Sequence, residues 1–220
     1  MKKESVYKGI LGLGAVSTAF YLKEIHHKYQ ERNGEFSTAS FVMYQIDFQE
    51  INPFLPNNFE VLIPKAKSYL KEISDLGITK LLIPNITLHE TLDQIEIPFE
   101  ICHPVDLTLE NLEKNRISEV YLFGTLYTMN SEYLNSKFSE RNIKILKPTH
   151  SDQSWIDTFR KKVYLEKQTS KEIEIFQNLI QKYSGKKPVV IACTELSIYS
   201  LKQNPSCIDM MDLQIEDFLK

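Results

Sequence analysis

The sequence predicts an α/β protein made of two similar halves, each built around a parallel sheet. The clearest strand is the apolar, β-branched run Val189–Ile191, which a turn signal at Ser184-Gly185 precedes and Cys193-Thr194-Glu195 follows at once. Short apolar runs of this kind are typical of strands buried on both faces of a parallel sheet. Ligands of such sheets bind outside the carboxyl ends of the strands, so Cys193 stands where a substrate could meet it.

The same pattern occurs earlier in the chain. Leu81–Pro84 is an apolar run, and the polar residue that follows it, Asn85, aligns with Cys193. Gly9–Gly12 aligns with Tyr121–Gly124 at a nearly equal offset. Two pairs at similar offsets indicate an internal duplication. A chance match is the alternative, because a strand followed by a polar turn is common in α/β proteins.

The remaining elements follow from periodicity and from turn residues. A glycine-rich loop, 12–18, separates the first strand from a helix that we expect to begin near Ser17. Residues 64–76 are amphipathic and end at Gly77, which is typical of a helix. The expected strands of the first half are 9–12, 40–48 and 81–84, and an extended crossing spans 95–105. In the second half we expect strands at 120–123, 143–146, 189–191 and 207–209, and helices at 107–115, up to 138, 155–167, 171–183 and 214–220.

Composition excludes several classes of function. With 220 residues, of which 42% are hydrophobic, the chain can bury a core as one domain or two small ones. The net charge of −3, with both signs interspersed, argues against nucleic-acid binding, and no stretch reaches the roughly 18 apolar residues of a membrane span. The sequence contains no C-x-x-C or H-x-x-x-H spacing, so it suggests no metal site. Cys102, Cys193 and Cys207 show no pairing pattern, which favours a reducing compartment, so we expect a cytoplasmic protein.

The start of the chain has two interpretations. Met1-Lys2-Lys3 followed by the apolar stretch 9–22 imitates a signal peptide. The glycines, Ser17 and Thr18 within that stretch, and the absence of a convincing cleavage site, fit a strand, a loop and a helix better. We therefore expect no signal peptide.

Two motifs carry a resemblance to a known family. Gly124-Thr125-Leu126-Tyr127-Thr128-Met129 and Cys193-Thr194-Glu195 match motifs of the aspartate/glutamate racemase superfamily, the cofactor-independent amino acid racemases, and the resemblance runs from Gly9 to Asp209. It implies two pseudo-symmetric Rossmann-like α/β/α domains, with the active site in the cleft between them. It also implies that no cofactor is needed, that the substrate is an amino acid or small carboxylic acid, and that a homodimer is possible. We expect an N-terminal domain of 1–98 plus 206–220 and a C-terminal domain of 99–205.

The chain departs from the family at one catalytic position. Members remove the α-hydrogen with a cysteine thiolate on one face and return a proton from a thiol on the other, but Asn85 stands where the first cysteine is expected. An amide cannot exchange protons near neutral pH, so a symmetric two-thiol mechanism is not available. Three hypotheses remain: a racemase or epimerase that relies on Cys193 and a water held by Asn85 or His89, a one-face enzyme like the related decarboxylases, and an inactive binding protein.

The resemblance also suggests roles for other residues. Cys193 is the expected acid or base, with an ordinary pKa of about 8.5 that a polar strand end or a following helix could lower, and its alternative is a buried structural cysteine. His89 and Glu195 flank the two catalytic positions and could orient a thiol or water, or serve as caps. Asp47 could border the substrate or cap a turn. The residues expected to bind the substrate are Thr87, Thr125, Thr128, Thr194, Ser17 and Thr18.

Two further points bear on these expectations. Each of the threonines is, taken alone, more often an N-cap or turn residue, and their recurrence after separate strands is what favours a site. Leu126 and Tyr127 stand where members with acidic substrates often carry a basic residue, which weakens the case for aspartate or glutamate.

Overall fold

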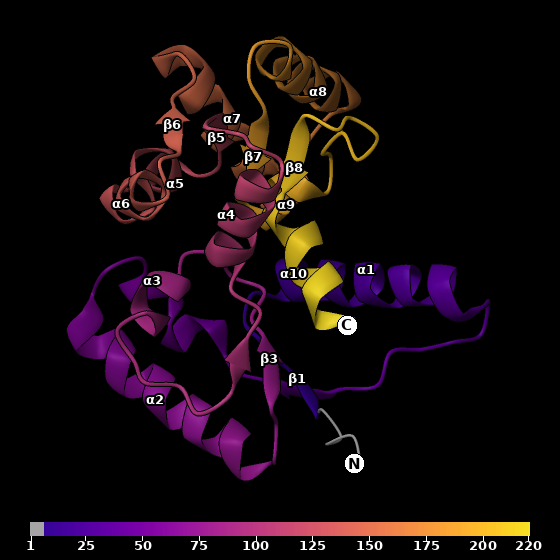
Figure 1. Cartoon of the computed structure of the whole chain (residues 1–220), viewed down its shortest axis with the longest axis vertical. Helices are drawn as coiled ribbons and strands as arrows, with labels where there is room; N and C mark the ends of the chain where they lie inside the picture. The colour runs from indigo at the N-terminus through magenta and orange to yellow at the C-terminus, as the bar shows by residue number, and fades with distance from the viewer. Residues whose placement is uncertain (1–6) are drawn as a thin grey trace. The chain divides into compact units, whose positions relative to one another are not determined.

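The computed structural model describes residues 7–220 (Figure 1). The basic start Met1-Lys2-Lys3, on which the signal-peptide question depends, lies outside the described residues. The chain divides into two compact units, Met1–His103 with Gln214–Lys220, and Pro104–Leu213. Within residues 7–220, no helix is both long and apolar enough to cross a membrane.

The first unit contains a four-stranded sheet in the order β2-β1-β3-β4, and every pair of neighbouring strands is parallel. Gly9 of the central strand pairs with Val42 on one side and with Leu81 on the other. The strands are β1 (Lys8–Gly12), β2 (Val42–Gln45), β3 (Lys80–Leu82) and β4 (Glu100–Ile101). The helices are α1 (Ala15–Asn33), α2 (Phe59–Asp75) and α3 (His89–Leu92), with short 3₁₀ turns at Phe48–Glu50 and Asn52–Phe54.

The central strands β1 and β3 are buried on both faces, which explains why they are apolar without alternation, whereas the edge strand β2 is largely exposed. Leu11 and Leu81 pack with Leu62 and Leu70 of α2 in one hydrophobic core. Side chains alternate along a strand, so Ile10, which is fully buried, faces the other side. The sheet is therefore the middle of three layers.

Two predicted helix starts differ from the observed ones. Helix α2 begins at Phe59, before the predicted start at Pro64, so Pro64 lies inside the helix rather than in its first turn, where proline is common. Helix α1 begins at Ala15 behind Gly14, which provides no side-chain cap. Ser17 instead donates a hydrogen bond of 3.1 Å to the carbonyl oxygen of Gly14.

The second unit repeats the topology of the first. Its four-stranded sheet has the order β6-β5-β7-β8 and is again parallel throughout. In both sheets the first strand of the unit lies between the second and the third, which supports the duplication inferred from the sequence. The strands are β5 (Glu119–Phe123), β6 (Lys144–Leu146), β7 (Val189–Ile191) and β8 (Cys207–Asp209). The helices are α4 (Pro104–Lys114), α5 (Leu126–Asn130), α6 (Glu132–Glu140), α7 (His150–Tyr164), α8 (Ser170–Ser184), α9 (Thr194–Ser197) and α10 (Met210–Phe218), the last of which continues into the first unit.

The core of the second unit is aromatic. Phe123 at the end of β5 packs with Phe159 of α7 and Phe176 of α8, and Phe159 and Phe176 stack with ring centroids 4.9 Å apart. Val189 and Ile191 of β7 join the same core, whereas Val190 between them is fully buried on the opposite face. Strand β7, which ends two residues before Cys193, is thus buried on both faces.

The limits of the units differ from those expected from the sequence. Residues 206–220 were expected to join the first domain, but β8 pairs in parallel with β7, so the chain stays in the second unit as far as Leu213. At the other crossing, the second unit begins at Pro104 rather than at residue 99. Gln214 explains where the chain returns, because its buried side chain accepts a hydrogen bond from Tyr21 (2.5 Å) and donates one to the carbonyl oxygen of Cys102 (2.7 Å).

Candidate active site

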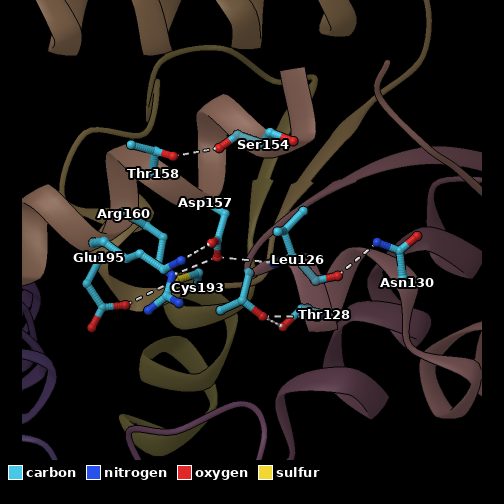
Figure 2. Close-up of polar contacts among 11 residues, drawn as sticks. Leu126, Thr128, Asn130, Ser154, Asp157, Thr158, Arg160, Cys193 and Glu195 are labelled. Atoms are coloured by element: carbon cyan, nitrogen blue, oxygen red, sulfur yellow. Dashed lines mark hydrogen bonds and ion pairs between the residues drawn. The ribbon is translucent and has the colours of Figure 1, made fainter. Parts of the chain in front are cut away.

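Cys193 lies at the carboxyl end of β7, where the sequence predicted it. It is 7% exposed and precedes the single turn of α9. Its thiol donates a hydrogen bond to the Glu195 carboxylate, with 3.0 Å between Sγ and Oε2. Figure 2 shows Glu195, Arg160 and Asp157 gathered around this cysteine. The sulfur thus has a carboxylate and a guanidinium group as neighbours.

The surroundings keep the thiol protonated. Burial raises the pKa of Cys193 well above its ordinary value, the charge of Glu195 and its hydrogen bond raise it further, and the charge of Arg160 opposes them. This is the reverse of the lowered pKa considered from the sequence. Helix α9 has four residues, so its dipole is weak, and the first polar group that the strand end offers is an anion. The resting thiol is therefore a proton donor.

Arg160 and Asp157 come from α7, a helix that the sequence analysis described only as amphipathic. Asp157 is 4% exposed, and its carboxylate pairs with Arg160 Nε at 3.1 Å and with Lys161 Nζ at 2.6 Å. It also accepts a hydrogen bond of 3.2 Å from the backbone N–H of Leu126, which ties α7 to the start of α5. An aspartate with basic residues three and four positions later on a predicted helix was the available signal, although such pairs occur on many surface helices.

The two threonines after β5 form a closed local structure. Thr125 is the N-cap of α5 and accepts a hydrogen bond of 3.0 Å from the backbone N–H of Thr128, and the two hydroxyl groups lie 2.9 Å apart. Gly124 must be a glycine, because a Cβ there would lie 2.9 Å from the Thr128 side chain and 3.2 Å from the carbonyl oxygen of Ala192. This close approach brings the ends of β5 and β7 together. Thr194, the first residue of α9, is also buried.

In the first unit, Asn85 follows β3 and organises its own loop. Its side-chain oxygen accepts a hydrogen bond of 2.8 Å from the backbone N–H of Leu88, and its carbonyl oxygen lies 2.7 Å from Nδ1 of His89. His89 is fully buried and packs edge-on against His103, with ring centroids 4.7 Å apart. Burial and the charge of His103 lower the pKa of His89 well below its ordinary value, so the imidazole is neutral and Nδ1–H is the donor. His89 therefore braces the Asn85 loop.

The other predicted residues of this unit lie at the carboxyl ends of β1, β2 and β3. Thr18 is buried and accepts a hydrogen bond of 3.2 Å from the backbone N–H of Leu13. Asp47 is exposed and caps the 3₁₀ turn that follows, since its side chain accepts from Gln49 N at 2.9 Å, which is the second of the two roles considered for it. Thr87 is half-buried in the Asn85 loop.

The candidate site residues thus lie in both units. The group in the second unit is the more complete chemically, because it combines a thiol, a carboxylate and a cation. Its members are Cys193, Thr194, Glu195, Thr125, Thr128, Arg160 and Asp157. In the first unit, Asn85, Thr87 and His89 lie in the segment after β3, whereas Ser17 and Thr18 follow β1 and Asp47 follows β2. Within residues 7–220, no set of three or more histidine, cysteine, aspartate or glutamate side chains is arranged to hold a metal ion.

Two four-stranded parallel sheets flanked by helices, with a cysteine after the third strand of the second sheet, have the two-domain fold of the Asp/Glu racemases. No protein-family model matches the sequence, and no curated protein has a matching sequence. The chain is similar to a Yersinia pestis protein described as an Asp/Glu racemase, with 18% identity, a TM-score of 0.82 and 98% of each chain covered. It is also similar to an aspartate racemase homologue from Pyrococcus horikoshii, with 18% identity, a TM-score of 0.81 and 97% of each chain covered.

A more distant likeness is to arylmalonate decarboxylase, in the structure of its Gly74Cys variant, where that number belongs to the other protein's chain. Identity is 8%, the TM-score is 0.53, and the alignment covers 97% of this chain and 91% of the other. At these low identities, the structural similarity shows the fold alone. The fold expected from the motifs is thereby confirmed.

Proposed function

We propose that this protein is a cofactor-independent amino acid racemase or epimerase in which Cys193 is the acid and base on one face of the substrate. The observation that carries the proposal is the short contact between the Cys193 thiol and Glu195, with Arg160 beside them (Figure 2). Buried thiols with structural roles pack against apolar groups. This thiol packs in the apolar core of its unit but also donates to a carboxylate at the end of a central strand, where α/β proteins bind their ligands.

The chemistry follows from the protonated state of the thiol. As an acid, Cys193 gives its proton to the carbanion at the substrate Cα, so the S–H bond breaks, a C–H bond forms and a thiolate remains. As a base, the thiol first gives its proton to Glu195, and the thiolate then takes the α-hydrogen of the substrate. Arg160 stabilises the thiolate in both directions, since its charge lowers the pKa of Cys193.

The negative charge on the substrate needs donors that are already in place. The carbanion is stabilised as an enolate, with charge on the oxygens of the α-carboxylate, and hydroxyl or N–H groups directed at those oxygens lower the barrier. Thr125, Thr128 and Thr194 supply such groups close to Cys193. We propose that they bind the α-carboxylate.

On the face of the substrate opposite Cys193, the protein offers a poorer proton donor and acceptor. The proposal requires one substrate to be reached by both Cys193 and Asn85, and the Asn85 oxygen already accepts a hydrogen bond from Leu88. The amide cannot titrate, and His89 is buried and neutral. A water held by the Asn85 amide is then the proton carrier on that face, which makes the two directions of racemisation unequal.

One observation favours a second function, a decarboxylase with a single cysteine. Protonation of a carbanion left by loss of CO2 needs an acid on one face only, and the resting thiol of Cys193 is such an acid. The likeness of the fold to arylmalonate decarboxylase fits this alternative. Binding of an amino acid or small acid without turnover is the third possibility.

A panel of amino acids in deuterated water distinguishes the three. A racemase or epimerase introduces deuterium at the α-position and changes the optical rotation, whereas a decarboxylase releases CO2 from malonate-type acids. Binding without either signal would indicate a binding protein and overturn the proposal. Cys193→Ala serves as the inactive control in every assay. Cys207→Ala is the matched control, because it removes a half-buried thiol elsewhere in the same unit.

A further inference from the structure

A second buried acidic group lies next to the strand that ends at Cys193. Asp209 is the last residue of β8, is 5% exposed and pairs in register with Ile191 of β7. It has no part in the chemistry proposed above. Buried carboxyl groups are costly, so one in this position calls for a specific role.

Hydrogen bonds lead from this carboxyl group to Cys193. Asp209 Oδ1 accepts from the Ser197 hydroxyl at 2.8 Å and from the backbone N–H of Met211 at 3.0 Å. The same Ser197 hydroxyl lies 3.3 Å from the carbonyl oxygen of Cys193, which also accepts from the Ser197 backbone N–H at 3.1 Å. Ser197 thus lies between the carboxyl group and the residue that carries the thiol, and it ends the single turn of α9.

The charged and titratable groups near Asp209 come from three segments. Burial and the nearby charge of Asp212 on α10 raise the pKa of Asp209 to about 7, while hydrogen bonds from Ser197, Met211 and Ser200 oppose them. Lys202 lies 3.6 Å from the Asp212 carboxylate, and Cys207 lies on β8 itself. Burial raises the pKa of the Cys207 thiol to about 11, so it stays neutral when Asp209 changes its charge.

We propose that Asp209 is a positioning residue that acts through Ser197 on the turn carrying Cys193, and that the charge state of Asp209 changes the reactivity of Cys193. A neutral carboxyl group shares the Ser197 hydroxyl with the Cys193 carbonyl. A carboxylate binds that hydroxyl more strongly, because a charged acceptor makes the shorter and stronger hydrogen bond. Ionisation then draws the hydroxyl away from Cys193 and adds a negative charge behind the thiol, which disfavours the thiolate.

The test is the pH dependence of Cys193 alkylation by iodoacetamide, followed by mass spectrometry of the peptide that contains it. This readout needs no turnover, so it stands or falls separately from the racemase proposal, on which only the catalytic meaning of the effect depends. Far below the pKa of a thiol, the alkylation rate rises tenfold per pH unit as the thiolate fraction grows. In the native chain we expect the rate to fall roughly three- to tenfold below that line as the pH passes 7, the size expected for one added charge at the effective dielectric constant of a protein interior.

Three variants identify the group responsible. Asp209→Asn is nearly isosteric and neutral at all pH values, so its profile should be straight through pH 7. Asp212→Asn removes the same charge from a neighbouring residue, and it should keep the inflexion but move it to lower pH, because the repulsion that raises the pKa of Asp209 is gone. Ser197→Ala should make the inflexion smaller and move it to higher pH. A straight native profile, an inflexion that persists in Asp209→Asn, or one that disappears only in Asp212→Asn would overturn the proposal.

Discussion

Replacement of Glu195 by glutamine should make the Cys193 thiol easier to ionise and the enzyme slower. The Sγ–Oε2 distance of 3.0 Å makes this a hydrogen bond to a charged acceptor, and the carboxylate also repels a thiolate. Hydrogen bonds to charged groups contribute about 1.5–3 kcal/mol, which corresponds to roughly one to two units in the pKa of the thiol. Glutamine keeps the size of the side chain and removes the charge, so alkylation of Cys193 should become about 10- to 100-fold faster at pH 8.

Turnover should change in the opposite direction. If Glu195 takes the thiol proton before the α-hydrogen is removed, its amide cannot do so, and α-hydrogen exchange in deuterated water should fall by about 100-fold or more. The assay compares the iodoacetamide rate at Cys193 with the exchange rate in the same preparation. Glu174→Gln, on the exposed surface of α8, is the matched control and should alter neither rate. Faster alkylation with unchanged exchange would refute the role of Glu195 as proton acceptor, and slower alkylation would refute the electrostatic reasoning.

Four further results are expected. Cys193→Ser should lower α-hydrogen exchange by about 100-fold or more, measured by loss of the α-proton NMR signal, whereas Cys207→Ala should leave it nearly unchanged. Exchange should be faster from one enantiomer than from the other, and Asn85→Cys should accelerate the slow one by providing a group that can titrate. Lys80→Met should lower the free energy of unfolding in urea by about 1 kcal/mol, because it removes the ammonium group that pairs with Glu100 and Asp217 at 2.7 and 2.9 Å, while Glu100 is exposed and Asp217 keeps Lys220 as a partner. The raised pKa of Asp209 contributes stability that is complete below the unfolded pKa near 4 and is lost as the pH rises through about 7, so the native chain should lose up to about 4 kcal/mol relative to Asp209→Asn across that window.

Three of these expectations have a specific opposing outcome. Equal exchange from both enantiomers would require a second titrating group opposite Cys193 and would contradict the asymmetry. A urea midpoint that Lys80→Met leaves unchanged would mean that the two carboxylates find water or other cations. Parallel stability curves for the native chain and Asp209→Asn between pH 4 and pH 7 would show that the carboxyl group titrates normally in the folded protein.

Features that depend on neighbours in the sequence were predictable. The apolar run Val189–Ile191 followed by a polar segment identified a central strand and put Cys193 at its end, and both are confirmed. The repeated order of elements predicted the two parallel sheets. Gly124 belongs to the same class, because its lack of a Cβ is needed where two strand ends meet. Local pattern and tertiary requirement agree at these positions.

The chemistry of the candidate site was less accessible, because it depends on packing between distant segments. Arg160 and Asp157 belong to a helix more than thirty residues before Cys193 in the sequence, and only the packing of α7 beside β7 brings them to the thiol. The direction of the thiol pKa shift could not be inferred either. A polar strand end predicts a lowered pKa when its first neighbour is a donor and a raised one when that neighbour is an anion such as Glu195.

The return of the chain at Gln214 has a consequence for biosynthesis. The second unit is one continuous segment, Pro104–Leu213, and every part of it has been translated before the first unit is complete. The first unit lacks its last piece until the ribosome has added Gln214–Lys220, which supplies the partner of Tyr21 and, through Asp217, one of the two anions bound to Lys80. Domains generally fold in the order in which they are synthesised. Here the N-terminal unit must wait for the C-terminal residues, so a chain stopped a few residues early would carry a finished second unit and an unfinished first one.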